Sequence, residues 1–339
     1  MKHFAVILAG GQGERFWPLS QPDFPKQFLS IFNKKPLIVQ TIDRIADFFK
    51  EEETILIIPE ELSCITKNFV RKGQIVIEPV RRNTAPAICL VAMKLKEEYG
   101  DGIMHIMPAD HLIRDKRRFL THLKFGEYLA QNGYLVTYGI NPTRPETGYG
   151  YIKIGEVLKK HKSGIVACEG KGFTEKPDRR RAKVYLRKKT FLWNSGIFTF
   201  KITDIIREME YHIPDVSKRV KSYLLTGERR HFEEIREISI DYGVMEKAAR
   251  FCVIKADFSW DDVGSWLALE RYFKGDCFKN IFIGDALGLD SRDSIVYSYN
   301  IPVKVYGIKK LVVVACPKGV LVCKKERASD LKNLLRIKG

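Results

Sequence analysis

A glycine-rich segment directly after the first apolar stretch is the feature that most constrains what this chain can fold into. Residues 4–8 are apolar and predict a strand, and glycines follow at positions 10, 11 and 13. Glycines let a backbone approach a bulky ligand closely, and the exposed N–H groups of such a loop form a cradle for anions. Arg15 and Lys26 follow as cations that can clamp phosphate oxygens. The segment therefore predicts a nucleoside triphosphate site.

Two better-known phosphate-binding loops do not fit this segment. A dinucleotide-binding loop needs a glycine or alanine three residues after the second glycine of its G-x-G, and that position is Phe16 here. The G-x-x-x-x-G-K-[ST] string of a P-loop occurs nowhere in the sequence. The alternative without a ligand is a strand-to-helix turn that carries two solvated cations.

The first part of the chain alternates apolar strands with helices. This alternation predicts an α/β fold with a doubly wound, mainly parallel, Rossmann-like sheet, and ligands bind such sheets at the carboxyl ends of the strands. Thr84 is the expected cap of the second helix. The expected strands cover residues 4–8, 54–58, 74–78, 103–107 and 135–140, and the expected helices cover residues 36–49 and 84–99.

Near residue 280 the alternation of strands and helices gives way to short strands. We therefore expect a catalytic domain over residues 1–277 and a small β-rich domain over 278–339. Short alternating strands are expected in the second of these, followed by a terminal helix over residues 328–337. The expected strands there cover residues 294–297, 303–306, 311–315 and 320–323. Cys316 and Cys323 flank an expected hairpin, where they either pair or pack as thiols.

The net charge of +17 raises the possibility of a nucleic-acid-binding protein. The densest basic run, residues 179–189, favours a solvated helix face that begins after Asp178 over a nucleic-acid-binding segment. In a segment that binds single strands, aromatic residues that stack on bases would alternate with the basic residues, and they do not do so here. A positive field also collects polyanionic small substrates. The seven cysteines lack C-x-x-C spacing, which argues against zinc and against a disulfide framework. No signal peptide, no membrane span and a cytoplasmic location are expected.

The whole string from Leu8 to Phe28, with Trp17-Pro18 and Pro25-Lys26-Gln27, resembles the signature of the nucleotidyltransferases that make nucleotide sugars. It is most similar to the mannose-1-phosphate guanylyltransferases, and the resemblance runs through at least six ordered motifs to about residue 266. It implies transfer of GMP from GTP to α-D-mannose 1-phosphate, which gives GDP-mannose and pyrophosphate. It also implies a homodimer and a C-terminal domain like a left-handed β-helix. Isomerase activity, which some relatives carry in an added domain, is not expected.

The resemblance implies that two aspartates hold Mg²⁺. Asp110 follows the strand over residues 103–107, and Asp262 lies in Trp260-Asp261-Asp262-Val263-Gly264. The family pattern places its aspartate two residues after the tryptophan and two before the glycine, which selects Asp262 over Asp261. Carboxylates together with substrate oxygens are the usual ligands of Mg²⁺ in phosphoryl chemistry.

Three cations are the expected catalytic residues. Arg15 clamps the leaving pyrophosphate, Lys26 lies near the α-phosphate, and Lys176 binds the sugar phosphate. No general base is needed, because a sugar phosphate is already largely dianionic at pH 7; His111 is therefore expected to be structural. The resemblance assigns nucleotide binding to Leu8, Ala9, Gly10, Gly11, Gly13, Glu78, Asn83, Thr84, Pro108 and Ala109. It assigns sugar binding to Gly148, Tyr149, Glu175 and Asn194, with Asp241 in a supporting role.

Other functions remain open at this point. A related enzyme could use another nucleotide or sugar phosphate, such as dTTP with glucose 1-phosphate, although the Asn83-Thr84 and Trp193-Asn194 segments favour guanine and mannose. A catalytically silent sensor of sugar nucleotides would be free to lose a metal aspartate or a phosphate clamp, whereas all of these residues are present.

Overall fold

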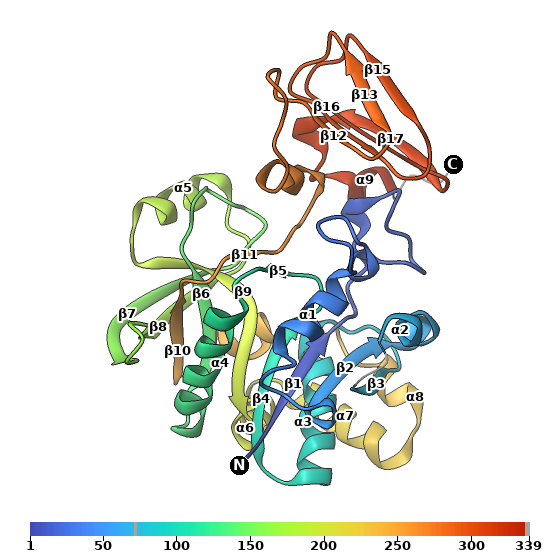
Figure 1. Cartoon of the computed structure of the whole chain (residues 1–339). Helices are drawn as coiled ribbons and strands as arrows, with labels where there is room; N and C mark the ends of the chain where they lie inside the picture. The colour runs from blue at the N-terminus through green and yellow to red at the C-terminus, as the bar shows by residue number, and fades with distance from the viewer. Residues whose placement is uncertain (71–72, 336–339) are drawn as a thin grey trace. The chain divides into compact units, whose positions relative to one another are not determined.

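The computed structural model describes residues 1–70 and 73–335, and Figure 1 shows its elements. The chain forms two compact units, and neither is continuous in sequence. The first unit comprises Met1–Gly10 and Thr41–Asp261, and the second comprises Gly11–Gln40 and the chain from Asp262 onward. The glycine-rich segment is thus divided, with its strand in the first unit and most of its loop in the second. Each unit is described separately below.

The first unit contains a nine-stranded sheet in the order β3-β2-β1-β4-β9-β6-β10-β8-β7. Strands β3, β2, β1 and β4 are parallel, as are β6 and β10, whereas β9 runs antiparallel between β4 and β6. The α/β class and the large, mainly parallel sheet are therefore confirmed. The strands are β1 (Lys2–Leu8), β2 (Thr54–Pro59), β3 (Gln74–Glu78), β4 (Gly102–Pro108), β6 (Leu135–Ile140), β7 (Tyr151–Lys160), β8 (Val166–Thr174), β9 (Phe191–Lys201) and β10 (Phe251–Ala256). Short β5 (Leu112–Ile113) and β11 (Trp260–Asp261) pair antiparallel.

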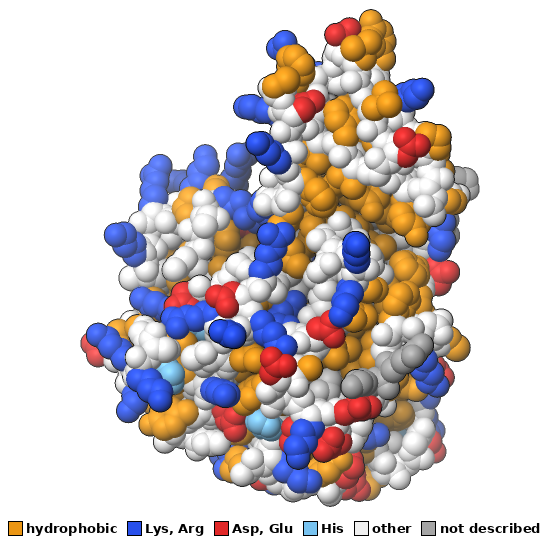
Figure 2. Space-filling view, in the orientation of Figure 1, with side chains coloured by type: hydrophobic (Ala, Val, Ile, Leu, Met, Phe, Trp, Pro, Cys, Tyr) orange, Lys and Arg blue, Asp and Glu red, His pale blue; other side chains and the backbone are white. Residues whose placement is uncertain are grey.

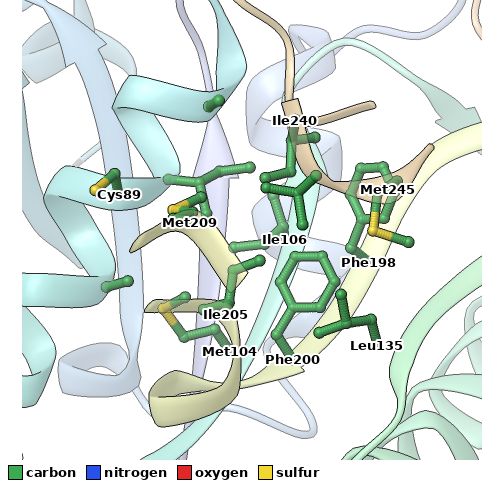
Figure 3. Packing of buried hydrophobic residues seen from close by; sticks show 14 of the residues in the cluster. Cys89, Met104, Ile106, Leu135, Phe198, Phe200, Ile205, Met209, Ile240 and Met245 are labelled. Carbon is green, nitrogen blue, oxygen red and sulfur yellow. The ribbon is translucent and has the colours of Figure 1, made fainter. Parts of the chain in front are cut away.

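Helices cover the sheet of the first unit. One face meets α3 and α6 in an apolar core, which Figure 3 shows with side chains from β4, β9, α3 and α6. The opposite face of β4 packs against α4, because successive strand residues point to opposite faces. Helix α1 (Leu37–Ile45) begins in the second unit and ends in the first. The helices that lie wholly in the first unit are α2 (Ser63–Phe69), α3 (Thr84–Tyr99), α4 (Lys116–Gln131), α5 (Arg179–Arg187), α6 (Ile202–His212), α7 (Pro214–Thr226) and α8 (Arg229–Glu233).

Two sequence predictions about helix ends are wrong. The helix expected over residues 36–49 ends at Ile45. Asn83, rather than Thr84, caps α3, since its Oδ1 accepts from the Thr84 N–H over 2.8 Å. The Thr84 hydroxyl instead accepts from the backbone N–H of Ile240 over 2.8 Å, a long-range contact that sequence pattern does not reveal.

The second unit is built of short strands that pair mostly in parallel. β12, β14 and β16 form one ladder, β13 and β15 another, and β16 and β17 form the expected antiparallel hairpin. Within it Cys323 lies opposite Val312, and Cys316 and Cys323 are free thiols. The strands are β12 (Ile281–Ile283), β13 (Ala286–Leu289), β14 (Ile295–Ser298), β15 (Val303–Tyr306), β16 (Leu311–Cys316) and β17 (Gly319–Lys324). The terminal helix α9 covers Leu331–Leu335, so the predicted start at residue 328 is three residues too early. Residues 336 and 337 of its predicted range lie outside the described residues.

Residues 11–40 belong to the second unit because their aromatic side chains pack there. Phe16 lies in the short helix η1 (Glu14–Phe16), with its ring centroid 5.1 Å from that of the fully buried Trp266. The Trp266 indole N–H donates to the Trp17 carbonyl over 3.1 Å. A Cβ on Gly319, at the β17 end of the hairpin, would lie 3.2 Å from the Trp17 ring.

Residues 179–187 of the basic run form the exposed helix α5, and residues 188 and 189 lie beyond its end. Asp178 caps α5 by accepting from the Arg181 N–H over 2.8 Å, and Ala182 is the buried residue of the helix. Figure 2 shows Lys and Arg side chains standing out from the surface over α5. Among the described residues, no helix is both long and apolar enough to span a membrane.

Candidate active site

Gly13 and Lys26 lie against each other in the second unit. Gly13 has a φ of +64°, and a Cβ on it would lie 2.4 Å from the Cβ of Lys26. The Gly13 carbonyl accepts from the Ser20 hydroxyl over 2.7 Å, which fixes the loop. Lys26 begins η2 (Lys26–Phe28) and is 6% exposed. Glycine is thus required at position 13 both for its conformation and for the approach of the lysine.

The same unit brings Arg15 and Lys26 to Asp262. The Lys26 ammonium donates to the Asp262 carbonyl. A Cβ on Gly264 would lie 2.8 Å from Asp262 Oδ2 and 3.3 Å from a terminal nitrogen of Arg15. Val263, between Asp262 and Gly264, has a φ of +47°. This conformation is rare for a β-branched residue, and such strained residues cluster at functional sites. Two cations and a carboxylate therefore surround Gly264, which has no side chain. Such a set of groups can bind phosphate and a hard cation.

In the first unit, Asp110 lies on a turn at the carboxyl end of β4. Neighbouring Ala109 is fixed on both sides, because its N–H donates to the Leu8 carbonyl over 3.0 Å and its carbonyl accepts from the Thr41 hydroxyl over 3.2 Å. The buried Arg44 of α1 donates to the carbonyls of His111 and Ile113 over 3.2 and 3.1 Å. Burial lowers the pKa of Arg44 to about 10.

His111 has its Nδ1 in contact with an indole. The Trp260 indole N–H donates to this nitrogen over 3.2 Å, and the two rings meet edge to face. Because an indole is only a donor, the Nδ1 lone pair of His111 is engaged in the bond. The expected structural role of this histidine stays a prediction.

The segment expected to bind the base is hydrogen-bonded to residues 238–240, since the Ile238 N–H donates to the Arg82 carbonyl over 3.3 Å. Glu78 ends β3, is buried, and accepts from the Arg82 N–H over 3.1 Å. Burial raises the pKa of Glu78 to about 7. Asn83 has a φ of +72° and an exposed side chain. A Cβ on Gly10 would lie 3.9 Å from Glu78 Oε2, so the start of the glycine loop passes close to this carboxyl group.

Residues expected to bind the sugar form a cluster in the first unit. Lys176, with a φ of +45°, directs its ammonium to Glu175 Oε1 at 2.7 Å. Asn194 donates from its amide to Asp241 Oδ1 over 2.8 Å and accepts from the Gly196 N–H over 3.1 Å. Burial raises the pKa of Asp241 to about 7, and the nearby Glu175 carboxylate adds to this shift. The cluster thus presents carboxylates, an amide and an ammonium.

The loop before β7 is organised by an ion pair. Arg144 Nε lies 3.0 Å from Glu146 Oε2, and Glu146 Oε1 accepts from the Gly148 N–H over 3.2 Å. Tyr149 is buried with its ring edge-on to those of Trp193 and Trp260, at centroid distances of 5.2 and 5.4 Å. Gly148 is exposed, so this loop offers backbone rather than ring surface at that position.

Comparison with known proteins decides the family. A model of the nucleotidyl transferase family matches residues 4–277, and a model described as a mannose-phosphate isomerase/GMP-like β-helix domain matches residues 284–336. A mannose-1-phosphate guanylyltransferase of Klebsiella pneumoniae is 36% identical over 97% of this chain and 72% of its own length. The chain belongs to the mannose-1-phosphate guanylyltransferase family.

Other known proteins resemble the chain to a similar degree. The alginate biosynthesis protein AlgA of Pseudomonas syringae pv. tomato is 35% identical over 97% of the chain and 70% of its own length. A crystal structure described as mannose-1-phosphate geranyltransferase from Thermus thermophilus superimposes with a TM-score of 0.89, at 34% identity and 99% coverage of both chains. The chain is therefore a sugar-1-phosphate nucleotidyltransferase whose C-terminal part is a β-helix domain.

In this member of the guanylyltransferase family, the predicted residues fall into groups. Gly13, Arg15, Lys26 and Asp262 are together in the second unit, and Glu175, Lys176 and Asn194 are together in the first. Arg44 was missed by sequence reasoning. The available signal was its position on α1, three residues after Thr41. This spacing places both residues on one face of the helix, so a charged residue stands on the side that packs against the protein.

Proposed function

We propose that the protein transfers GMP from GTP to α-D-mannose 1-phosphate and releases GDP-mannose and pyrophosphate. The observation that carries this proposal is the similarity to the Klebsiella guanylyltransferase, which extends over 97% of the chain. The nucleotidyl transferase model matches residues 4–277, which include every proposed site residue. Similarity confined to the nucleotide loop would favour nucleotidyl transfer in general without favouring this pair of substrates.

The reaction is a displacement at phosphorus. A phosphate oxygen of mannose 1-phosphate forms a bond to the α-phosphorus of GTP, and the bond from that phosphorus to the oxygen bridging to the β-phosphate breaks. Pyrophosphate takes the electron pair of that bond. Since the attacking phosphate is already largely ionised at pH 7, catalysis consists of positioning and charge stabilisation rather than proton abstraction.

The cations of the chain are proposed to hold the phosphates. Arg15 is proposed to hold the pyrophosphate as it leaves, since a guanidinium suits paired phosphate oxygens. Lys26, whose stem is buried against Gly13, is proposed to face the α-phosphate. Lys176 is proposed to bind the sugar phosphate from its position beside Glu175.

The donor set suits Mg²⁺. Asp110 and Asp262 are the proposed ligands, and both offer the oxygen atoms that this hard cation prefers. Gly264 leaves the space beside Asp262 Oδ2 that any larger residue would fill. When bound, Mg²⁺ neutralises phosphate charge around the reacting phosphorus. Sugar selectivity is proposed to come from Glu175 and Asn194, which offer acceptors and a donor for neighbouring hydroxyl groups.

Pyrophosphate release tests this proposal directly. The full chain is assayed with Mg²⁺ and mannose 1-phosphate against GTP, ATP, dTTP and UTP in turn, and with GTP and glucose 1-phosphate. Turnover confined to GTP with mannose 1-phosphate and lost in a folded Asp262→Ala variant supports the proposal. Preferred turnover with another pair of substrates assigns a different sugar nucleotide. No turnover with any triphosphate overturns the enzyme assignment and favours the silent sensor.

A further inference from the structure

Two histidines and a glutamate meet in the first unit, at the opposite end of the strands from the glycine loop. His3 lies near the start of β1 and His105 in the middle of β4. Ala5 pairs with His105 in the parallel register, so His3, two residues earlier, shares the sheet face of His105. Glu127 reaches the same place from α4, and one ligand atom of each of the three residues lies within 4.8 Å of the other two.

His105 has a buried ring nitrogen without a partner. The residue is fully buried, and its Nδ1 lies 2.9 Å from the Thr199 hydroxyl. That hydroxyl is in turn 2.7 Å from the Tyr138 hydroxyl. The Nε2 atom has no hydrogen-bond partner in the structure. Buried polar atoms in native proteins are nearly always paired, so an unpaired imidazole nitrogen beside a carboxylate and a second imidazole indicates a missing ligand.

His3, the partly exposed histidine of the cluster, also has a ring nitrogen that faces an oxygen atom outside the cluster. Its Nδ1 lies 3.4 Å from Glu127 Oε2, and its Nε2 lies 3.6 Å from Glu53 Oε2. The Glu53 carboxylate is itself fixed, because it accepts from the Lys50 N–H over 2.8 Å. Each histidine therefore has one ring nitrogen toward the cluster and the other toward an oxygen of the surrounding protein. Histidines that bind metals show this arrangement, since the outer oxygen sets the tautomer and the ring orientation.

The surroundings are apolar on one side and open on the other. The rings of Phe48 and Phe49 have centroids 4.9 Å from that of His3, and Phe49 lies 5.2 Å from His105. The side chains of His3 and Glu127 are 22% and 19% exposed, which leaves a route for an ion and room for a water ligand. A fully enclosed cluster would lack that route.

We propose that His3, His105 and Glu127 form a binding site for a transition metal ion of the Zn²⁺ type, with water as the fourth ligand. Two imidazoles and one carboxylate are a common zinc ligand set, and nitrogen donors favour such ions over Mg²⁺ and Ca²⁺. The absence of C-x-x-C spacing does not bear on a site built from histidine and glutamate. A metal here joins β1, β4 and α4 and stabilises the first unit. A metal binds the neutral form of each imidazole.

Metal analysis of the full chain tests the site. Chelator-treated protein is equilibrated with Zn²⁺ in a large excess of Mg²⁺, and bound zinc is measured by elemental analysis; Co²⁺ is then substituted and its visible absorption recorded. One zinc per chain, a tetrahedral Co²⁺ spectrum and a Zn²⁺-dependent rise in Tm are expected. Glu127→Gln is expected to weaken Zn²⁺ binding by about 100-fold or more, given that even outer partners contribute about 10–100-fold.

The matched control is Glu208→Gln. Glu208 also faces a histidine, since its Oε2 lies 3.3 Å from His212 Nε2, but it belongs to no three-residue cluster among the described residues. This variant is expected to bind Zn²⁺ as the unaltered chain does. His3→Gln, at a partly exposed position, serves as a second ligand variant if Glu127→Gln does not fold. Zinc binding that is absent from the unaltered chain, or equal in Glu127→Gln and Glu208→Gln, overturns the proposal.

Discussion

Gly150 and Glu175 touch so closely that no side chain fits between them. A Cβ on Gly150 would lie 2.4 Å from Glu175 Oε2, and 3.0 Å from the Phe173 ring. The Gly150 carbonyl also accepts from the Asn194 N–H over 2.8 Å. One glycine ahead of β7 therefore determines where two of the proposed sugar-binding residues lie.

Replacing Gly150 with alanine is expected to displace the Glu175 carboxylate. Because that carboxylate is the end of a flexible side chain, it can move, and the free energy of unfolding should fall by less than about 1 kcal/mol. The KM for mannose 1-phosphate should rise about tenfold, since one misplaced hydrogen bond is worth about 1–1.5 kcal/mol. Gly172→Ala on β8 is the control, because its Cβ would meet no atom within 4 Å. Equal KM values for the two variants would contradict the proposed role of Glu175.

Gly13→Ala is expected to damage both stability and turnover. Its φ of +64° and the 2.4 Å approach to the Lys26 Cβ penalise any side chain. Strain of about 1–2 kcal/mol from the left-handed conformation adds to overpacking of about 1–3 kcal/mol. Urea unfolding should therefore show a loss of about 2–5 kcal/mol. Gly11→Ala, where nothing lies within 4 Å of the added Cβ, should unfold like the unaltered protein.

Two lysine–glutamate pairs, one within β8 and one just beyond its end, allow a test of Lys176. Lys176 pairs with Glu175 and Lys171 pairs with Glu169, both at 2.7 Å. Exposed pairs of this kind contribute about 0–1 kcal/mol, so neither alanine variant should lose much stability. Lys176→Ala should lower kcat/KM for mannose 1-phosphate by about 10–100-fold, the equivalent of one charged hydrogen bond. Lys171→Ala should leave kcat/KM for mannose 1-phosphate within about twofold of the unaltered value. A similar loss in both lysine variants would instead indicate an effect of the overall positive field.

Asp241 is expected to make stability depend on pH. Its pKa is raised to about 7 by burial, so the folded state holds a proton that the unfolded state releases above its ordinary pKa of 3.8. The resulting penalty is absent below about pH 4, grows as the pH rises, and is complete above about pH 7. Asp241→Asn should therefore unfold like the unaltered protein at pH 4 and be about 2 kcal/mol more stable at pH 8.

Asp215→Asn provides the control of opposite sign. The Arg236 guanidinium lowers the pKa of Asp215, so that this carboxylate stabilises the fold at neutral pH and stops doing so as the pH falls through the lowered pKa. Removing it should reduce stability at pH 8. Urea unfolding at pH 4 and pH 8 gives the free energy of unfolding of the Asp241→Asn and Asp215→Asn variants. An Asp241→Asn variant that gains no stability at pH 8 would contradict the raised pKa of Asp241.

Sequence reasoning succeeded where the signal is local. The strand over residues 74–78 and the helix over residues 84–99 match β3 and α3 residue for residue, because apolar periodicity and breakers mark such elements. The free thiols and the solvated face of α5 were also predictable from composition and spacing. The structure places the expected phosphate residues near one another and the expected sugar residues near one another, whereas their roles stay predictions.

Long-range contacts account for what the sequence did not reveal. The antiparallel position of β9 between β4 and β6 depends on pairing between strands dozens of residues apart. Asn83 displaced Thr84 as the α3 cap because the Thr84 hydroxyl is engaged by Ile240. Arg44 acts through the carbonyls of His111 and Ile113, which lie far along the chain. None of these partners can be read from a window of neighbouring residues. The predicted domain boundary at residue 277 stays a prediction.

The interleaving of the two units has a consequence for biosynthesis. Residues 11–40 leave the ribosome early, yet the residues they pack against begin at Asp262, so more than two hundred residues are made in between. During that interval Phe16 and Trp17 have no Trp266 to cover them. A nascent chain therefore cannot bury these two aromatic side chains against Trp266 until more than two hundred further residues have been made, which leaves apolar surface exposed next to its glycine loop in the interval.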